Sequence, residues 1–163
     1  VGLAVRAVGA GLRVWMVQFD KGFDGENEHY SERKVLRGLP GLRLDPTGCE
    51  RVMPDGRFRF GVTPDDLAEA ARGLGLARQA VLSDGHDLVI LDEALSAQRY
   101  KLIRESDLLD LVALWRERGR CELVLSGRTK LQSVLDAADL VTEMRKVKHY
   151  FDDGLPARLG IEF

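Results

Sequence analysis

The stretch Leu88-Val89-Ile90-Leu91-Asp92-Glu93 decides the fold, because four consecutive apolar residues end in two adjacent carboxylates. An unbroken apolar run of this kind is typical of a central strand that is buried on both faces of a parallel sheet. Successive strand residues point to opposite faces, so the two acids are expected to do different jobs. The stretch therefore predicts a buried parallel strand with paired acids at its carboxyl end.

Strand and helix patterns alternate on both sides of this stretch. The apolar runs that predict strands are 13–19, 87–91, 121–125 and 140–144. The amphipathic runs that predict helices are 64–82, 105–118 and 130–137, and the chain also opens inside a helix that ends at Gly9-Ala10-Gly11. This alternation predicts an α/β fold with a mainly parallel sheet and helices on both faces. Open sheets of this kind bind ligands at the carboxyl ends of their strands.

A long polar stretch rich in Gly, Pro and Asp, residues 22–64, separates the first strand from the first long helix. It has only weak strand patterns, near 42–44 and 57–60, and long loops often carry function. Within it, Phe58 and Phe60 alternate with Arg57 and Arg59, which in an extended segment places both rings on one side. The rings could close a hydrophobic cofactor site or anchor the loop to the core. The residue pattern alone favours the anchor.

Composition favours one globular domain spanning residues 1–163, with 45% apolar and 31% charged residues. The formal net charge of -2 gives no electrostatic case for a nucleic-acid or anionic-membrane partner, so a small-molecule partner is expected. No apolar run approaches the roughly 18 residues that cross a bilayer, and no signal peptide is visible, which predicts a cytoplasmic protein. Cys49 and Cys121 lack metal-ligand spacing and are interpreted as free thiols in a reducing compartment.

Polar residues follow two of the predicted strands. At the end of 87–91, one of Asp92 and Glu93 would reach toward Mg²⁺ on nucleotide phosphates while the other orients water or a neighbour, as in a Walker B strand. The alternative for Asp92 and Glu93 is a solvated acidic turn.

Ser126-Gly127-Arg128 follows the next strand, and Arg128 could pair bidentately with phosphate oxygens or lie on the surface of an ordinary turn. Arg6, on the opening helix, has the pattern of a solvated helix face. Hydrolase and protease motifs are absent from the sequence.

Taken in order, several segments resemble the P-loop type of the ATP:corrinoid adenosyltransferase family across nearly the whole chain. The matching segments are 3–9 (LAVRAVG), 17–22 (VQFDKG), 31–33 (SER), 58–60 (FRF), 91–93 (LDE), 126–128 (SGR), 138–144 (ADLVTEM), 147–149 (VKH) and 160–162 (GIE). Each segment alone is a weak match, whereas their ordered combination is specific. The resemblance implies a P-loop NTPase-like (RecA-like) fold.

The same resemblance implies an enzyme that transfers the 5′-deoxyadenosyl group of ATP to the reduced cobalt of a corrinoid, cob(I)alamin, forming adenosylcobalamin and releasing triphosphate. Glu93 would ligate Mg²⁺ on the ATP phosphates with Asp92 as its neighbour. Arg6 and Arg128 would contact the triphosphate. Phe58 and Phe60 would lie against the lower face of the corrin, which replaces the anchor interpretation. A homodimer, and a reductase that supplies the reduced cobalt, are also implied.

Three departures from the family pattern accompany this resemblance. The phosphate loop Gly-x-x-x-x-Gly-Lys-Thr is expected before Val1 and is absent from this sequence, so a truncated chain that binds ATP poorly is expected. The family usually shows Phe-Thr-Trp where this chain has Phe58-Arg59-Phe60, and the residues after Glu93 lack the usual Asn and Tyr. Two alternatives stay open: a non-catalytic corrinoid- or nucleotide-binding module, and a P-loop kinase or ATPase of another family.

Overall fold

A four-stranded parallel sheet forms the centre of the computed structural model, which describes residues 1–163 except 24, 26–27, 54–56, 130 and 162–163. The strands lie in the order β2-β1-β3-β4, and each neighbouring pair is parallel. Their bounds are β1 Val14–Gln18, β2 Leu42–Pro46, β3 Leu88–Asp92 and β4 Glu122–Leu125. The predicted α/β fold with a parallel sheet is confirmed, and it is consistent with a P-loop NTPase-like protein.

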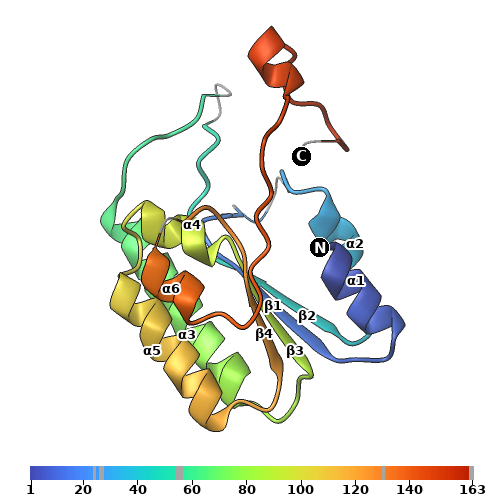
Figure 1. Ribbon diagram of the computed structural model, residues 1–163. Coiled ribbons are helices and arrows are strands. Elements are labelled where there is room, and N and C mark those ends of the chain that lie inside the picture. The colour runs from blue at the N-terminus through green and yellow to red at the C-terminus, as the bar shows by residue number, and fades with distance from the viewer. Residues whose placement is uncertain (24, 26–27, 54–56, 130, 162–163) are drawn as a thin grey trace.

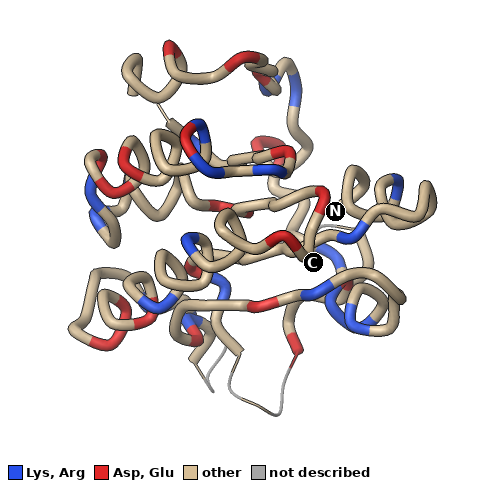
Figure 2. Tube along the Cα trace, turned by 90° about the horizontal axis from the view of Figure 1, so that it is seen from below, with Lys and Arg blue, Asp and Glu red and all other residues tan. Residues whose placement is uncertain are grey.

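Helices cover both faces of this sheet (Figure 1). Two of them, α1 Gly2–Gly9 and α2 Glu32–Leu36, lie on one face. On the other face lie α3 Pro64–Leu82, α5 Glu105–Arg118 and α6 Gln132–Asp136. The short helix α4 Ala94–Arg99 follows β3 directly, and the 3-10 helix η1 Tyr150–Asp153 lies near the end of the chain. Basic and acidic residues are intermixed along most of these elements (Figure 2), in keeping with the small net charge.

Side-chain alternation along β1 and β3 divides the core into two layers. Val14 and Met16 pack with Ala4 and Ala7 of α1 in one cluster. Trp15 and Val17 of β1, with Phe19 directly after the strand, pack in a second cluster against α3 and α5. Both strands are buried on both faces, as the unbroken apolar runs predict.

The two long helices begin and end where the sequence predicts. For α3 the reason is local: Pro64 occupies the first helical position, and Thr63 and Asp66 form a reciprocal capping box. The Thr63 hydroxyl accepts a hydrogen bond from the Asp66 amide at 3.3 Å, and the Asp66 carboxylate accepts one from the Thr63 amide at 2.8 Å. This box fixes the direction in which the preceding loop reaches the helix.

Four expectations about secondary structure need correction. The stretch 22–64 contains helix α2, which was not predicted, whereas its weak strand pattern near 42–44 is confirmed by β2, which pairs with β1 along its whole length. The segment 57–60 contributes only an isolated bridge between Val52 and Phe58. Helix α4 was not predicted. The predicted strand 140–144 is wrong: the segment lies exposed, with Leu140 85% and Met144 95% accessible, because an apolar run forms a strand only where another backbone pairs with it.

The predicted free thiols are confirmed, since Cys49 and Cys121 form no disulfide. Among the described residues, no helix has both the length and the apolarity that crossing a membrane requires.

Candidate functional site

The carboxyl ends of β1, β3 and β4 meet at one edge of the sheet, and polar residues gather there. Gln18 is the register partner of Asp92 on the neighbouring strand. The Ser126 amide donates to the Leu91 carbonyl at 3.1 Å, which brings the end of β4 beside the same acid. The sequence prediction that Asp92, Glu93 and the Ser126-Gly127-Arg128 turn share one edge is therefore confirmed.

Three neighbours hold the Asp92 carboxylate. Lys21 Nζ lies 2.8 Å from Oδ2, Gln18 Nε2 donates to the same oxygen at 3.1 Å, and the Ser126 hydroxyl donates to Oδ1 at 2.8 Å. Burial opposes ionisation of Asp92, yet the charge of Lys21 and the three hydrogen bonds together bring its pKa below the ordinary value. Asp92 is thus an ionised group that already accepts three hydrogen bonds within the protein.

Glu93 is placed differently although it is the next residue. Its backbone is left-handed, with φ 60° and ψ 14°, and it precedes the first residue of α4. Its amide donates to the Ser126 hydroxyl at 3.1 Å, while its carboxylate has no hydrogen-bond or ion-pair partner within the described part of the chain. Left-handed backbone at a residue other than glycine costs on the order of 1–3 kcal/mol and is common at functional sites. The surrounding structure therefore holds Glu93 with a free carboxylate.

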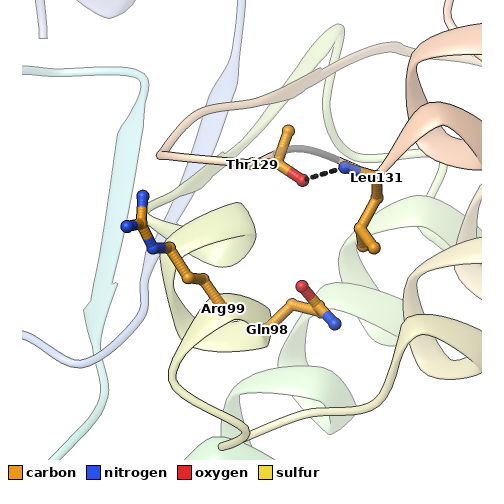
Figure 3. A pocket seen from close by; sticks show the side chains of 4 residues that line it. All are labelled: Gln98, Arg99, Thr129 and Leu131. Atoms are coloured by element: carbon orange, nitrogen blue, oxygen red, sulfur yellow. Dashed lines mark hydrogen bonds between the residues drawn. The ribbon is translucent and has the colours of Figure 1, made fainter.

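Glu93 lines a cleft of about 230 Å³ at the sheet edge, which we call the carboxylate cleft. Its lining residues are Phe19, Asp20, Lys21, Tyr30, Glu93, Ser96 and Tyr100. A second hollow of about 240 Å³ lies at the far end of α4, between Gln98 and Arg99 of that helix and Thr129 and Leu131 of the loop before α6 (Figure 3). Helix α4 thus lines both hollows.

Arg128 lies close to the acid pair through the backbone. Its amide donates to the Ser96 hydroxyl of α4 at 3.0 Å, and its side chain is exposed. Gly127 has φ 129°, and a Cβ at this position would lie 2.6 Å from the Ser96 amide nitrogen, so only glycine permits this close approach. The structure does not bring Arg6 into this group: it is exposed on α1 and forms no ion pair with Asp92 or Glu93 in the described residues.

The two phenylalanines of the aromatic loop, residues 49–61, are exposed. The exposed fractions are 52% for Phe58 and 85% for Phe60, and their ring centroids lie 5.3 Å apart in an edge-to-face arrangement. Their predicted placement on one side of the segment is confirmed. The interpretation in which they anchor the loop to the core is wrong, because neither ring is buried.

Sequence reasoning missed the residues that shape the cleft wall. Arg33 is fully buried; its guanidinium donates to the Gln18 side-chain oxygen at 2.6 Å, to the backbone carbonyl of Lys21, and to Glu28 at 3.2 Å. Burial lowers the pKa of Arg33, and the charge of Glu28 opposes that effect. A single buried arginine thereby fixes the segment that carries Lys21. Nothing in the local pattern of the segments 17–22 and 31–33 indicates this contact.

The residues at the sheet edge fit Mg²⁺ only as an ion held largely by substrate phosphates. No group of three or more His, Cys, Asp or Glu side chains suited to a metal occurs in the part of the chain that the structure describes. Mg²⁺ in nucleotide sites is usually held by one or two carboxylates together with phosphate oxygens. Glu93 offers one free carboxylate of this kind, whereas Asp92 is paired with Lys21.

Fold and site together define a class: a parallel α/β protein with acids and a basic turn at the ligand-binding edge of its sheet. The chain belongs to the ATP:corrinoid adenosyltransferase family, since the family model described as ATP:corrinoid adenosyltransferase BtuR/CobO/CobP matches residues 1–163. Proteins of this family transfer an adenosyl group, with ATP and a corrinoid as substrates.

Relatives that carry the name corrinoid adenosyltransferase agree with this assignment. The chain is similar to the corrinoid adenosyltransferase of Escherichia coli strain K12, with 33% identity over 165 residues, which is 99% of this chain and 76% of the relative. It is also similar to corrinoid adenosyltransferase CobA of Salmonella typhimurium, with 33% identity over 168 residues and the same two coverages. The corrinoid adenosyltransferase of Pseudomonas aeruginosa is 30% identical over 164 residues, which is 99% of this chain and 75% of the relative.

Proposed function

We propose that this protein transfers the 5′-deoxyadenosyl group of ATP to the Co(I) centre of a reduced corrinoid, cob(I)alamin, and releases triphosphate. The observation that supports this most strongly is the free Glu93 carboxylate, which lines a cleft at the sheet edge beside the Lys21–Asp92 ion pair. In this proposal residues 1–163 act as one nucleotide- and corrinoid-binding domain. The family resemblance further supports a homodimer that receives reduced cobalt from a reductase.

The proposed reaction is a single displacement. Co(I) supplies an electron pair to C5′ of ATP, a Co–C bond forms, and the C5′–O bond breaks as triphosphate leaves with its electron pair. No proton moves in this step, so no general base is required. Catalysis then consists of positioning the two substrates and stabilising the charge that develops on the leaving group.

Five of the six candidate residues would contact a substrate or the metal in this proposal, and the sixth, Asp92, would act as the neighbour of Glu93. Glu93 would hold the Mg²⁺ that accompanies the phosphates, and that ion would offset the charge of the departing triphosphate. Arg128, whose side chain is exposed at the same edge, would contact phosphate oxygens. Arg6 is proposed for the same role on the family resemblance alone. Phe58 and Phe60 would lie under the corrin and exclude a lower ligand, which would leave cobalt four-coordinate and easier to reduce.

The products distinguish this proposal from its alternatives. Protein expressed from its complete coding sequence is incubated with ATP, Mg²⁺ and chemically reduced cobalamin. The proposal predicts the absorption spectrum of adenosylcobalamin and one triphosphate for each adenosyl group transferred. Release of orthophosphate without that spectrum would indicate an ATPase, and corrinoid binding without any product would indicate a non-catalytic module.

A further inference from the structure

Four charged side chains pair with one another between the carboxylate cleft and the aromatic loop; they are Asp20, Arg51, Arg59 and Asp66. Arg51 Nε donates to Asp20 at 2.8 Å, and its terminal nitrogen lies 3.9 Å from Asp66. The Arg59 guanidinium donates one hydrogen bond to each carboxylate oxygen of Asp66, at 2.9 and 2.7 Å, and so forms a bidentate pair. Two positive and two negative groups thus form a continuous chain of ion pairs, which we call the loop clamp.

The loop clamp is largely removed from solvent. The Asp66 side chain is 0% exposed, Arg51 10% and Arg59 26%. Bidentate arginine–carboxylate pairs have a narrow preferred geometry, and separating one partner from a buried pair is costly. The clamp therefore holds its members in one arrangement.

This clamp joins the cleft to both arms of the aromatic loop. Asp20 lines the carboxylate cleft together with Glu93. Arg51 lies on the first arm and donates to the carbonyl of Gly61 at the end of the second, at 2.9 Å. The Arg59 amide donates to the Arg51 carbonyl at 2.7 Å, which ties the arms to each other. Both arms are thus fixed to Asp66, which belongs to the capping box of α3.

Close main-chain packing also connects the wall of the carboxylate cleft to the aromatic loop. A Cβ on Gly22 would lie 2.1 Å from the carbonyl carbon of Cys49, and a Cβ on Gly48 would lie 2.7 Å from the Cα of Asp20. The cleft wall and the start of the aromatic loop are therefore in direct main-chain contact. A displacement of one segment would move the other.

We infer that Arg59, Arg51 and Asp66 are positioning residues that set where Phe58 and Phe60 stand relative to the carboxylate cleft. Arg59 lies between the two phenylalanines, and neighbouring side chains of an extended segment point to opposite sides. Fixing Arg59 against Asp66 therefore turns both rings outward, as their exposure shows. The inference rests on the proposed function in one respect, namely that the corrin is the ligand that meets these rings.

Arg59→Met tests this inference, and the chain offers a matched control. Arg104 forms a similar bidentate pair with Asp107 at the start of α5, with hydrogen bonds of 3.2 and 2.8 Å, but it lies outside the loop clamp. In Arg59→Met the KM for the reduced corrinoid should rise about ten- to a hundred-fold while the KM for ATP stays within about twofold. Arg104→Met should change neither value, and Arg59→Lys, which keeps the charge without the bidentate pair, should lie between Arg59→Met and the wild type.

Hydrogen exchange gives a second readout that needs no activity. The amides of Met53 and Arg59 are bonded across the two arms of the loop, at 2.8 and 2.7 Å. Their exchange should quicken by about tenfold in Arg59→Met and remain unchanged in Arg104→Met. Unchanged exchange, or an equal rise of KM for both substrates, would overturn the inference. A wild-type protein that transfers no adenosyl group would overturn the proposed function instead, and the exchange comparison would still decide whether the clamp holds the loop.

Discussion

Lys21 Nζ lies 2.8 Å from Oδ2 of Asp92, and this ion pair separates the roles of two acids that are adjacent in sequence. The carboxylate of Asp92 accepts hydrogen bonds from Lys21, Gln18 and Ser126, whereas that of Glu93 is free beside the cleft. Asp92 is the last residue of β3, whereas Glu93 lies beyond the strand in left-handed backbone, and the difference in their environments depends on residues distant in sequence. Lys21 thus neutralises Asp92 and leaves Glu93 as the acid that is available to a ligand.

Removal of Lys21 should make activity more sensitive to acid. In Lys21→Met, burial of Asp92 is no longer opposed by a positive charge, so the pKa of Asp92 rises. Asp92 then takes up a proton at higher pH, and the acid limb of the kcat/KM profile should move to higher pH than in the wild type. Steady-state rates across pH measure this. Lys34→Met, on the exposed side of α2, is the control, and superimposable profiles for both variants would contradict the role of Lys21.

Two glycines of α3 should respond in opposite ways to alanine. A Cβ on Gly73 would lie 2.8 Å from Cε1 of Phe19 and 2.9 Å from the Thr47 hydroxyl, so Gly73→Ala should destabilise the fold by about 1–3 kcal/mol. Gly75 has open space at the same point, so Gly75→Ala should stabilise it by about 0.5–1 kcal/mol through helix propensity. Chemical denaturation measures both values. Equal effects of the two changes would show that α3 does not pack on β1 as described.

Asp66 should contribute stability that is lost in acid. Hydrogen bonds from Arg59, with further ones from Thr63, hold the pKa of Asp66 well below its ordinary value despite burial. A carboxyl whose folded-state pKa is depressed stabilises the fold above its unfolded pKa of about 3.9 and loses this contribution as pH falls below it. Asp66→Asn should therefore cost about 1–3 kcal/mol at pH 7.

The difference between wild type and Asp66→Asn should shrink as the pH falls below about 4, since the unfolded wild-type chain then binds a proton at Asp66 that the folded state, with its lower pKa, does not bind. Unfolding free energies at a series of pH values test this. A difference that stays constant down to acid pH would mean that ionisation of Asp66 contributes nothing to stability.

Local signals in the sequence were sufficient for much of the fold. The ends of α3 and α5 were predicted correctly because apolar periodicity marks both helices and Pro64 marks the start of the first. The strand that ends in Asp92 and Glu93 was predicted from four apolar residues and its two acids. Thr63 and Asp66 also have the spacing of a capping box, which marks the same helix start.

Long-range contacts account for what local signals missed. The segment 140–144 has the composition of a strand, but strand formation needs a paired backbone, which composition does not specify. Arg59 and Asp66 meet because a loop folds back on a helix, and Arg33 is buried because three separate segments offer it acceptors. The exposure of Phe58 and Phe60 contradicts the anchor that the residue pattern favours, and their contact with the corrin stays a prediction of the family resemblance.

The rate of adenosyl transfer by Glu93→Gln tests most directly whether the free carboxylate at the sheet edge serves the reaction. The change keeps side-chain size and removes the charge, and Glu117→Gln on the exposed face of α5 is the matched control. We expect Glu93→Gln to retain the wild-type unfolding midpoint and to lose at least about a hundredfold in transfer rate at saturating ATP and Mg²⁺. A folded Glu93→Gln protein that transfers the adenosyl group within a fewfold of the wild-type rate would contradict the proposed role of this cleft.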